Sequence, residues 1–419
     1  MRDGFITMNR IKWCTLVAII CITGLWTSCQ KEIKPLKEGL WRGVFTLPGN
    51  EIPFLFEVKG EQPESTLVYL INGTDRFELK NITYINDSVS IPIDLYSSVL
   101  KGKLSENIIE GHLVKIGTDK PVAGVPFKAE LGNLPRFAKS NVLPTISLAG
   151  TWDINIINPD NTDKTVGVFE QKESILTGSI LTPTGDYRFF EGVVTGKKFQ
   201  LSAFGGSTPY LLKGEFSTDS TFSGEFITPR NSSKIEGKLN PKAALPDPYT
   251  ASYLKEGFTS LDFSFPNLEG KLVSLADPKY KGKVVIVTIL GSWCPNCLDE
   301  NAFLSEWYKT NSQRGVEIIG LGFERKNDFE YAKKALSNLK TRLGITYDIL
   351  FAGQSGTANA SKALPALNGI SAFPTTIFID KKGNVRKVHT GFTGPATGKF
   401  YEEFKVEFNT LIDKLLEEK

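Results

Sequence analysis

The chain has 419 residues, of which 41% are hydrophobic and 23% are charged, and its formal net charge is +3. This balance is typical of a folded protein, and the length is sufficient for two or three domains. Basic and acidic residues are interspersed without a basic patch, so neither composition nor charge supports a nucleic-acid-binding protein.

The N-terminal residues have the layout of an export signal. Arg10 and Lys12 precede an apolar run, residues 13–25, which is short for a membrane span. Two small residues then lead to Cys29, an order that resembles a bacterial lipoprotein processing site. We therefore expect residues 1–28 to be a signal peptide and Cys29 to be the lipidated first residue of the mature protein. Cleavage as an ordinary secreted protein and an uncleaved anchor are alternatives, and in each case the chain leaves the cytoplasm.

Cysteine usage is consistent with export. Cys14 and Cys21 would leave with the signal and Cys29 would be acylated, so the mature protein would keep only Cys294 and Cys297. An exported redox protein benefits from having no other thiol that forms a wrong disulfide.

Residues 41–241 have the pattern of an all-β region. Short alternating segments, such as 53–58 and 67–71, are separated by turn-forming pairs, and little of this half has helical periodicity. The turn-forming pairs are Asn72-Gly73, Asn86-Asp87 and Gly205-Gly206.

The all-β region repeats itself at an offset of about 111 to 113 residues. The sequence Gly39-Leu40-Trp41 is echoed by Gly150-Thr151-Trp152, and similar echoes surround Gly102 and Gly214, and Gly111 and Gly224. We interpret this half as two consecutive β modules, each a small barrel or sandwich. The expected ranges are 38–135 and 147–241, with a linker at 133–144 and a second linker at 241–249.

No catalytic pattern is visible in the two β modules. We interpret His112 as a structural residue of a strand, and Trp41 and Trp152 as core residues at equivalent strand starts. Exposed aromatic rings could bind a sugar or a peptide, but the sequence does not identify such rings.

The C-terminal domain is expected at residues 253–419. A β-hairpin at 257–275, with its turn at Glu269-Gly270, comes first. Strands and helices then alternate, which predicts a mixed sheet covered by helices. The predicted elements are strand 284–290, helix 294–313, strand 316–323, helix 328–343, strand 345–351, helix 356–367, strand 375–380, strand 385–390 and helix 399–416.

The first of these strands leads directly to a pair of cysteines. Residues 284–290 are aliphatic or β-branched on both faces, as in a buried central strand, and Pro295 suits the first turn of a helix. Cys294 and Cys297 therefore lie one turn apart at a helix N-terminus. There the helix dipole and the free N–H groups stabilise a thiolate, and the second thiol can resolve a mixed disulfide. This pattern predicts thiol–disulfide exchange.

Two other interpretations of Cys294-Pro-Asn-Cys297 are weaker. A zinc site needs two more ligands, and the other cysteines are N-terminal while the histidines are only His112 and His389. A purely structural disulfide across so short a loop stabilises little. We expect no metal, and no cofactor other than the redox-active disulfide of Cys294 and Cys297.

Residues 255–419 resemble the TlpA/ResA-like thiol:disulfide oxidoreductases, which have a thioredoxin-like fold within the redoxin superfamily. The N-terminal β modules are similar to those that precede such domains in envelope proteins of Bacteroidetes-type bacteria. The matching pieces are Leu261-Asp-Phe263, Gly270-Lys271, Val273-Ser-Leu275, Lys281-Gly-Lys-Val-Val285, Trp293-Cys294-Pro-Asn-Cys297, Pro374-Thr375 and Ile379-Asp380-Lys-Lys-Gly383.

The resemblance implies roles for individual residues. Cys294 would be the attacking thiolate and Cys297 the resolving thiol. Phe373 and Pro374 match the cis-proline loop that presents backbone to the substrate chain, although a bulky Phe373 departs from the usual pattern and could narrow substrate choice. The residues expected to contact substrate are Trp293, Pro295, Phe373 and Pro374.

Glu300 matches an acidic residue that relatives carry one turn after the second cysteine, where it tunes or deprotonates the resolving thiol. Because Cys297 and Glu300 are three residues apart, they share a helix face. The alternative is an ordinary first-turn acid favoured by the helix dipole. Thr288 stands where thioredoxins have a buried acid, which leaves Glu300 as the nearby proton acceptor.

Three classes of function follow. The favoured one is an enzyme that reduces, or less readily oxidises, disulfides of exported proteins, drawing electrons from a membrane donor. The second is a thiol peroxidase, although the residues before Cys294 lack the peroxiredoxin pattern. The third is a client-binding protein whose β modules carry specificity. The expected location is the cell envelope, lipid-anchored and facing the periplasm, at the outer or inner membrane.

Overall fold

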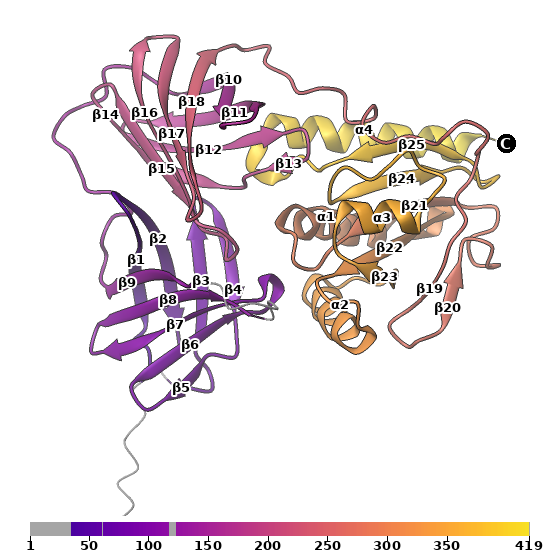
Figure 1. Cartoon of the computed structure of the whole chain (residues 1–419), viewed down its shortest axis with the longest axis horizontal. Helices are drawn as coiled ribbons and strands as arrows, with labels where there is room; N and C mark the ends of the chain where they lie inside the picture. Colours follow the sequence, from indigo (N-terminus) through magenta and orange to yellow (C-terminus); the bar gives the residue numbers. More distant parts are fainter. Residues whose placement is uncertain (1–34, 61, 117–122, 419) are drawn as a thin grey trace, which may run out of the picture.

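The computed structural model describes residues 35–60, 62–116 and 123–418, which form two β units followed by an α/β unit (Figure 1). The expected signal peptide and Cys29 lie outside the described residues. Within these ranges, no helix is both long enough and apolar enough to cross a membrane.

The first unit is a nine-stranded antiparallel sheet that curves into a half-barrel. Its strand order is β4-β3-β2-β1-β9-β8-β7-β6-β5, so β4 and β5 are its two edges. A short 3-10 helix, η1 (Asp94–Tyr96), joins β6 to β7. The strands are β1 (Gly39–Leu47), β2 (Asn50–Lys59), β3 (Leu67–Asn72), β4 (Asp75–Leu79), β5 (Thr83–Ile85), β6 (Ser88–Ile93), β7 (Ser98–Ser105), β8 (Ile108–Lys115) and β9 (Val125–Leu131).

The second unit is a closed barrel. Its strand order is β11-β10-β18-β17-β16-β15-β14-β12-β13, and a further pairing of β11 with β12 closes the ring. Closure leaves the short strand β13 as an appendage of β12. The strands are β10 (Gly150–Ile157), β11 (Thr162–Lys172), β12 (Ile175–Thr182), β13 (Gly185–Asp186), β14 (Phe190–Thr195), β15 (Lys198–Ala203), β16 (Tyr210–Thr218), β17 (Thr221–Ile227) and β18 (Ser232–Leu239).

The two β units begin in the same way. Trp41 on β1 and Trp152 on β10 are fully buried, and each indole N–H donates to the carbonyl four residues earlier, at 3.0 Å and 2.8 Å. Each of these strands pairs with the next strand and with the last strand of its unit. The equivalent glycines and tryptophans seen in the sequence therefore occupy equivalent structural positions, and both tryptophans are core residues.

Buried polar contacts join the half-barrel to the barrel. Arg136, in the expected linker, is only 3% exposed and donates to the Pro53 carbonyl and the Ser202 hydroxyl. The Asn72 side chain exchanges two hydrogen bonds of 2.9 Å with the backbone of Phe204. Because buried hydrogen-bonding groups are costly to leave unpaired, these contacts hold the two units in one relative position.

The third unit is a five-stranded mixed sheet with order β23-β22-β21-β24-β25, flanked by helices and preceded by a hairpin. β21, β22 and β23 are parallel, whereas β24 and β25 are each antiparallel to their neighbours. This is the α/β arrangement predicted for the C-terminal domain. The elements are β19 (Ser264–Pro266), β20 (Leu272–Ser274), β21 (Val284–Leu290), α1 (Pro295–Asn311), η2 (Ser312–Arg314), β22 (Val316–Glu324), α2 (Phe329–Leu343), β23 (Asp348–Gln354), α3 (Thr357–Ala363), β24 (Thr375–Ile379), β25 (Val385–Thr390), η3 (Pro395–Thr397) and α4 (Lys399–Glu417).

Among the helices and strands predicted after the hairpin, both bounds of β23 and the end of α3 differ by three residues or more from the predicted ones, and the other boundaries agree within two residues. β23 begins three residues later than predicted, because the chain closes α2 with Gly344 in a left-handed conformation and buries Ile345 and Tyr347 before pairing starts. α3 ends at Ala363 rather than near residue 367, because Pro365 cannot continue a helix.

One hydrophobic cluster passes through the half-barrel and the α/β unit. It includes Phe77 and Tyr96 from the half-barrel, both cysteines, and side chains of α1, α2 and α4. The other face of the mixed sheet and the barrel interior form separate clusters. The cluster also contains Phe204, Leu211 and Ile227 of the barrel, so the pair of cysteines lies inside a core to which all three units contribute.

Candidate active site

The two cysteines lie where the sequence predicts them, at the junction of β21 and α1. Every residue of β21 is buried, and α1 begins at Pro295. Cys294 caps this helix, and its sulfur accepts a hydrogen bond of 3.3 Å from the backbone N–H of Cys297. Both cysteines are free thiols. The Cys294 sulfur is thus held at the helix N-terminus with a backbone N–H directed at it.

The two thiols differ in exposure. Cys294 is 7% exposed and Cys297 is fully buried. Burial, followed by the contact with Cys294, raises the pKa of Cys297 well above its ordinary value. Cys294 is therefore the more accessible of the two thiols, and burial keeps Cys297 protonated.

Glu300 lies on the same helix one turn after Cys297 and is 2% exposed. Its two carboxylate oxygens accept hydrogen bonds of 2.6 Å from the hydroxyls of Thr288 and Thr376. These threonines are directly paired across β21 and β24. Burial raises the pKa of Glu300 to about 7, and the two threonine hydrogen bonds oppose this rise. The carboxyl can therefore exchange a proton near neutral pH, and Thr288 holds it in place.

The proline loop faces the first cysteine. The Phe373–Pro374 peptide bond is cis, and the Phe373 carbonyl oxygen lies 3.5 Å from the Cys294 sulfur. The ring of Trp293 packs on the ring of Phe373, with centroids 5.5 Å apart. Of the expected substrate-contacting residues, the structure thus brings Trp293, Phe373 and Pro374 together beside Cys294. Pro295 begins α1 and lines the pocket described below.

A buried carboxylate that the sequence analysis missed supports the loop before Cys294. Glu324, at the end of β22, accepts hydrogen bonds from the Ser292 N–H at 2.9 Å and the Ser292 hydroxyl at 2.8 Å. Burial raises the pKa of Glu324 to about 7. The next residue, Arg325, lies over the Trp293 ring at 5.4 Å. An acid directly after the apolar strand predicted at 316–323 was the available signal.

Asn301 and Tyr347 form a second support that sequence reasoning missed. The Asn301 amide donates to the Cys297 carbonyl at 2.8 Å, and the Tyr347 hydroxyl donates to the Asn301 side-chain oxygen at 2.8 Å. Both side chains are fully buried. This chain of hydrogen bonds fixes the first turn of α1 against the loop before β23.

The barrel contacts the start of α1 through a buried ion pair that sequence reasoning missed. Arg188 of the barrel forms an ion pair of 3.0 Å with Asp299 of α1, and its guanidinium also lies 3.7 Å from Asp75 and 3.3 Å from the Tyr96 hydroxyl. Burial raises the pKa of Asp299 to about 7, and Arg188 opposes this rise. These partners are at least 92 residues from Arg188 in the chain, so no local pattern indicates them.

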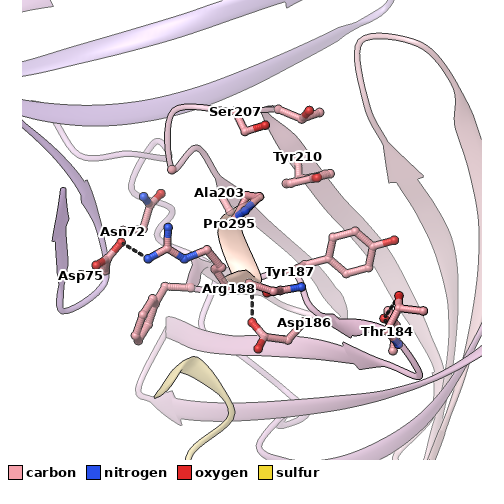
Figure 2. A pocket seen from close by; sticks show the side chains of 15 residues that line it. Asn72, Asp75, Thr184, Asp186, Tyr187, Arg188, Ala203, Ser207, Tyr210 and Pro295 are labelled. Carbon is pink, nitrogen blue, oxygen red and sulfur yellow. Dashed lines mark hydrogen bonds and ion pairs between the residues drawn. The ribbon is translucent and has the colours of Figure 1, made fainter. Parts of the chain in front are cut away.

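A pocket of about 200 Å³ lies between the three units, beside the start of α1 (Figure 2). Figure 2 shows the Arg188 guanidinium turned toward Asp75, with Pro295 and Tyr210 nearby. The residues that line this pocket are mostly polar or aromatic and include Asp75, Asp186, Arg188, Tyr210, Pro295 and Asn296.

The two histidines lie away from the thiols. His112 is exposed on β8, and His389 is buried against Tyr249 and Phe404. Burial lowers the pKa of His389 to about 4, and its Nδ1 lies 3.1 Å from the Gly391 carbonyl. Among the described residues, no three His, Cys, Asp or Glu side chains are grouped to hold a metal ion.

Comparison with known proteins agrees with this geometry. The Redoxin family model matches residues 255–401. Thiol-disulfide oxidoreductase ResA of Geobacillus thermodenitrificans is 34% identical over 137 residues, which are 32% of this chain and 69% of that protein. The ResA protein of Bacillus subtilis is 28% identical over 138 residues, again 69% of its length.

A solved structure, a thioredoxin-family thiol:disulfide interchange protein from Chlorobium tepidum, shares 25% sequence identity with this chain. It covers 39% of this chain and 98% of its own, with a TM-score of 0.30. The Redoxin model thus matches within the α/β unit, and the two ResA relatives align with about a third of this chain. Through this α/β unit, which carries Cys294 and Cys297, the chain belongs to the ResA family of thiol-disulfide oxidoreductases.

Proposed function

We propose that this protein reduces disulfide bonds of exported proteins in the cell envelope, with Cys294 and Cys297 as its redox-active pair. The observation that carries the proposal is the arrangement at the start of α1. There Cys294 accepts a hydrogen bond from the Cys297 N–H and faces the Phe373 carbonyl, while Cys297 is buried behind it. This arrangement suits an attacking thiolate paired with a resolving thiol.

The reaction proceeds in two exchanges. The Cys294 thiolate attacks one sulfur of a client disulfide, which forms a mixed disulfide and releases the other client sulfur as a thiolate that takes up a proton. Cys297 then loses its proton and attacks the Cys294 sulfur, which releases the second client thiol. The client gains two electrons, and the enzyme is left with the Cys294–Cys297 disulfide.

Glu300 is the proposed acceptor of the Cys297 proton. It is buried one turn further along the same helix, and its pKa of about 7 lets it exchange a proton at neutral pH. The ordinary alternative, an exposed first-turn acid, does not describe a side chain that is 2% exposed and bonded to two threonines.

The cycle needs a reductant, because each turnover leaves the enzyme oxidised. We propose that a dithiol protein of the membrane supplies the electrons to the exported chain. We also propose that a lipid on Cys29 attaches the chain to the membrane. The support for this is the layout of residues 1–29 together with the absence of other cysteines from the proposed mature chain.

Trapping of mixed disulfides tests the assignment of roles. In Cys297→Ala the client cannot be released, so client proteins should accumulate as disulfides of Cys294. Cys294→Ala is the matched control and should trap none. Equal trapping by both variants would reverse the assignment of the two cysteines, and trapping by neither would remove the proposed function.

The reduction potential of the pair decides the direction of electron flow. Titration against glutathione should give a value near that of thioredoxin, about −270 mV, for a reductase. A value near −120 mV would make the protein an oxidant of newly exported chains instead.

A further inference from the structure

A short segment of the barrel contacts two places beside the redox-active cysteines: the dipeptide between them and the loop that follows β25. We define the barrel arm as residues 185–188, which connect β12 to β14 and include β13. In the orientation that satisfies both of its amide groups, Asn296 donates to the Asp186 carbonyl at 3.1 Å and accepts from the Asp186 N–H at 3.2 Å. The barrel arm is therefore paired with one of the two residues between Cys294 and Cys297.

The side chain of the same aspartate reaches the loop that follows β25. Its carboxylate accepts hydrogen bonds from the Gly394 N–H at 2.8 Å and the Arg188 N–H at 2.6 Å. The loop that carries Gly394 begins at Gly391, whose N–H donates to the Pro374 carbonyl at 2.9 Å. Asp186 thus links the dipeptide between the cysteines to the loop bonded to the cis-proline.

Arg188 fastens the barrel arm from its other end. Its ion pair with Asp299 joins the arm to α1, two residues beyond Cys297, and its contacts with Asp75 and Tyr96 join the arm to the half-barrel. Only 13% of the Arg188 side chain and 12% of the Asp299 side chain are exposed. At this burial the pair is weakly screened by solvent, and loss of one partner would leave an uncompensated charge.

The contact between the barrel and the α/β unit depends on glycines, because a Cβ atom at these positions would clash with the opposite unit. A Cβ atom on Gly185, whose φ is +144°, would lie 2.0 Å from an end atom of the Asn296 side-chain amide, which is its oxygen in the orientation given above. A Cβ on Gly391 would lie 2.8 Å from the Thr184 carbonyl carbon, and one on Gly394 would lie 2.9 Å from an Asp186 carboxylate oxygen. At Gly391 the backbones of the two units meet directly, whereas at Gly185 and Gly394 the glycine backbone meets the side chains of Asn296 and Asp186.

We propose that the barrel arm is a positioning element of the redox site, and that the β modules thereby set the reduction potential of Cys294 and Cys297. The inference rests on the proposed function of this pair. Pro295 and Asn296 are the backbone between the Cys294 sulfur and the Cys297 N–H that donates to it. By holding Asn296, the barrel arm holds that donor against the sulfur. A hydrogen bond to the thiolate stabilises the reduced form and makes the pair more oxidising.

The decisive variant changes no residue of the α/β unit. Gly185→Ala pushes a methyl group into the Asn296 amide and should shift the equilibrium with glutathione about tenfold toward the disulfide, which equals about 30 mV toward more negative potential. Asn296→Ala should shift it in the same direction, because it removes both amide hydrogen bonds. In the double variant the amide atoms that the methyl group would meet at 2.0 Å and 2.7 Å are gone, and only the Cβ of residue 296 remains near it, at 3.3 Å. The potential of the double variant should therefore equal that of Asn296→Ala alone.

Gly196→Ala is the matched control. Gly196 is a barrel glycine with a φ of +58°, and the nearest atom to its added Cβ is Val142 Cγ1 at 3.5 Å. This variant should keep the wild-type potential. Each potential is measured on the full chain by glutathione titration with alkylation of the free thiols, and circular dichroism verifies that each variant is folded.

Two results would overturn the proposal. One is an equilibrium constant with glutathione that differs less than twofold between Gly185→Ala and wild type. The other is a double variant that shifts further than Asn296→Ala, which would mean that Gly185→Ala acts by damaging the barrel. The titration needs no client protein, so it reports on the barrel arm even if Cys297→Ala traps no client.

Discussion

Glu300 is a carboxyl group enclosed between two threonine hydroxyls, and its position makes a kinetic prediction. Glu300→Gln replaces the carboxylate with a polar amide of similar size that still forms hydrogen bonds but cannot accept the Cys297 proton. The second exchange, in which Cys297 resolves the mixed disulfide, should slow about a hundredfold near pH 7, while the first attack by Cys294 should not change. Stopped-flow measurement of the two phases with a model disulfide separates these steps.

The matched control for this variant is Glu306→Gln. Glu306 lies on the same helix, its side chain is 73% exposed, and it pairs only with Lys309 among the contacts described. It should leave both phases unchanged. If Glu300→Gln also has wild-type kinetics, Glu300 is a structural group and another route carries the proton.

The same carboxyl group predicts a dependence of stability on pH. Burial raises its pKa from 4.5 to about 7, so the folded protein binds this proton more tightly than the unfolded chain does. The contribution of Glu300 to the free energy of unfolding should therefore fall as the pH rises from about 4.5 to 7, by about 1.4 kcal/mol per pH unit. Glu300→Gln lacks this contribution, so its stability relative to wild type should increase across this window in urea unfolding. A constant difference between the two proteins at pH 5 and pH 8 would contradict the assigned pKa.

At the residue scale, sequence reasoning reached the residues whose roles depend on short spacing. Cys294, Cys297 and Glu300 are spaced along one helix, and Phe373-Pro374 precedes a strand, so local patterns identify them. Glu324 and Arg188 were missed, because each acts on the site through a partner far away in the chain. Nothing near either residue in the sequence indicates that partner.

At the scale of elements, the junction of β21 and α1 depends on a support from β22. Glu324 binds both the N–H and the hydroxyl of Ser292, which lies two residues before Cys294. Glu324→Ala would leave these two donors without their acceptor in a buried site. We expect a loss of about 1–3 kcal/mol in the free energy of unfolding, together with faster alkylation of Cys294 as the loop loosens.

Glu324→Gln is the conservative comparison for this element. It keeps one acceptor oxygen for Ser292, so its loss of stability should be smaller than that of Glu324→Ala. Urea unfolding and iodoacetamide kinetics on the three proteins provide the test. Equal behaviour of wild type and Glu324→Ala would show that the loop is held by the rest of its surroundings.

The order and type of the α/β elements could be predicted because buried strands and amphipathic helices have distinct periods. The residues at which these elements begin and end could be predicted less accurately. The start of β23 depends on how Tyr347 packs and bonds to Asn301, and the end of α3 depends on Pro365, which the predicted helix had included. Tertiary contacts decide such boundaries, so single-sequence patterns place them within a few residues.

At the scale of the whole molecule, the shared hydrophobic cluster predicts coupled unfolding. Arg342 of α2 lies over the Phe77 ring at 4.1 Å and donates to the Glu78 carbonyl at 2.7 Å, so the half-barrel covers a face of the α/β unit. The full chain should lose its helix and its barrel structure at one urea concentration. The isolated segment 253–419 should unfold at a lower concentration, because that face becomes exposed.

Far-ultraviolet circular dichroism and tryptophan fluorescence, followed together, test this coupling. Coincident transitions in the full chain support it. Two separate transitions, with the helical one matching that of segment 253–419, would show that the units are stable independently of one another.

The repeat in the β half indicated two related units, and their fold class could be predicted from alternation and turn residues. Their arrangement around the cysteines could not. It rests on contacts between positions such as Asp186 and Gly394, or Arg188 and Asp299, that are separated by about a hundred residues or more. A single sequence contains no signal that pairs them.

The close approach of Gly185, Gly391 and Gly394 across the contact limits how this protein can be recombined with its relatives. An α/β unit transplanted from another family member would bring its own residues to positions 296, 299, 391 and 394. Side chains in place of the glycines would collide with the barrel, and loss of Asp299 would remove the nearer of the two carboxylates that pair with Arg188. The two halves of this chain are therefore matched parts, and a functional chimera would need these positions exchanged together with the barrel.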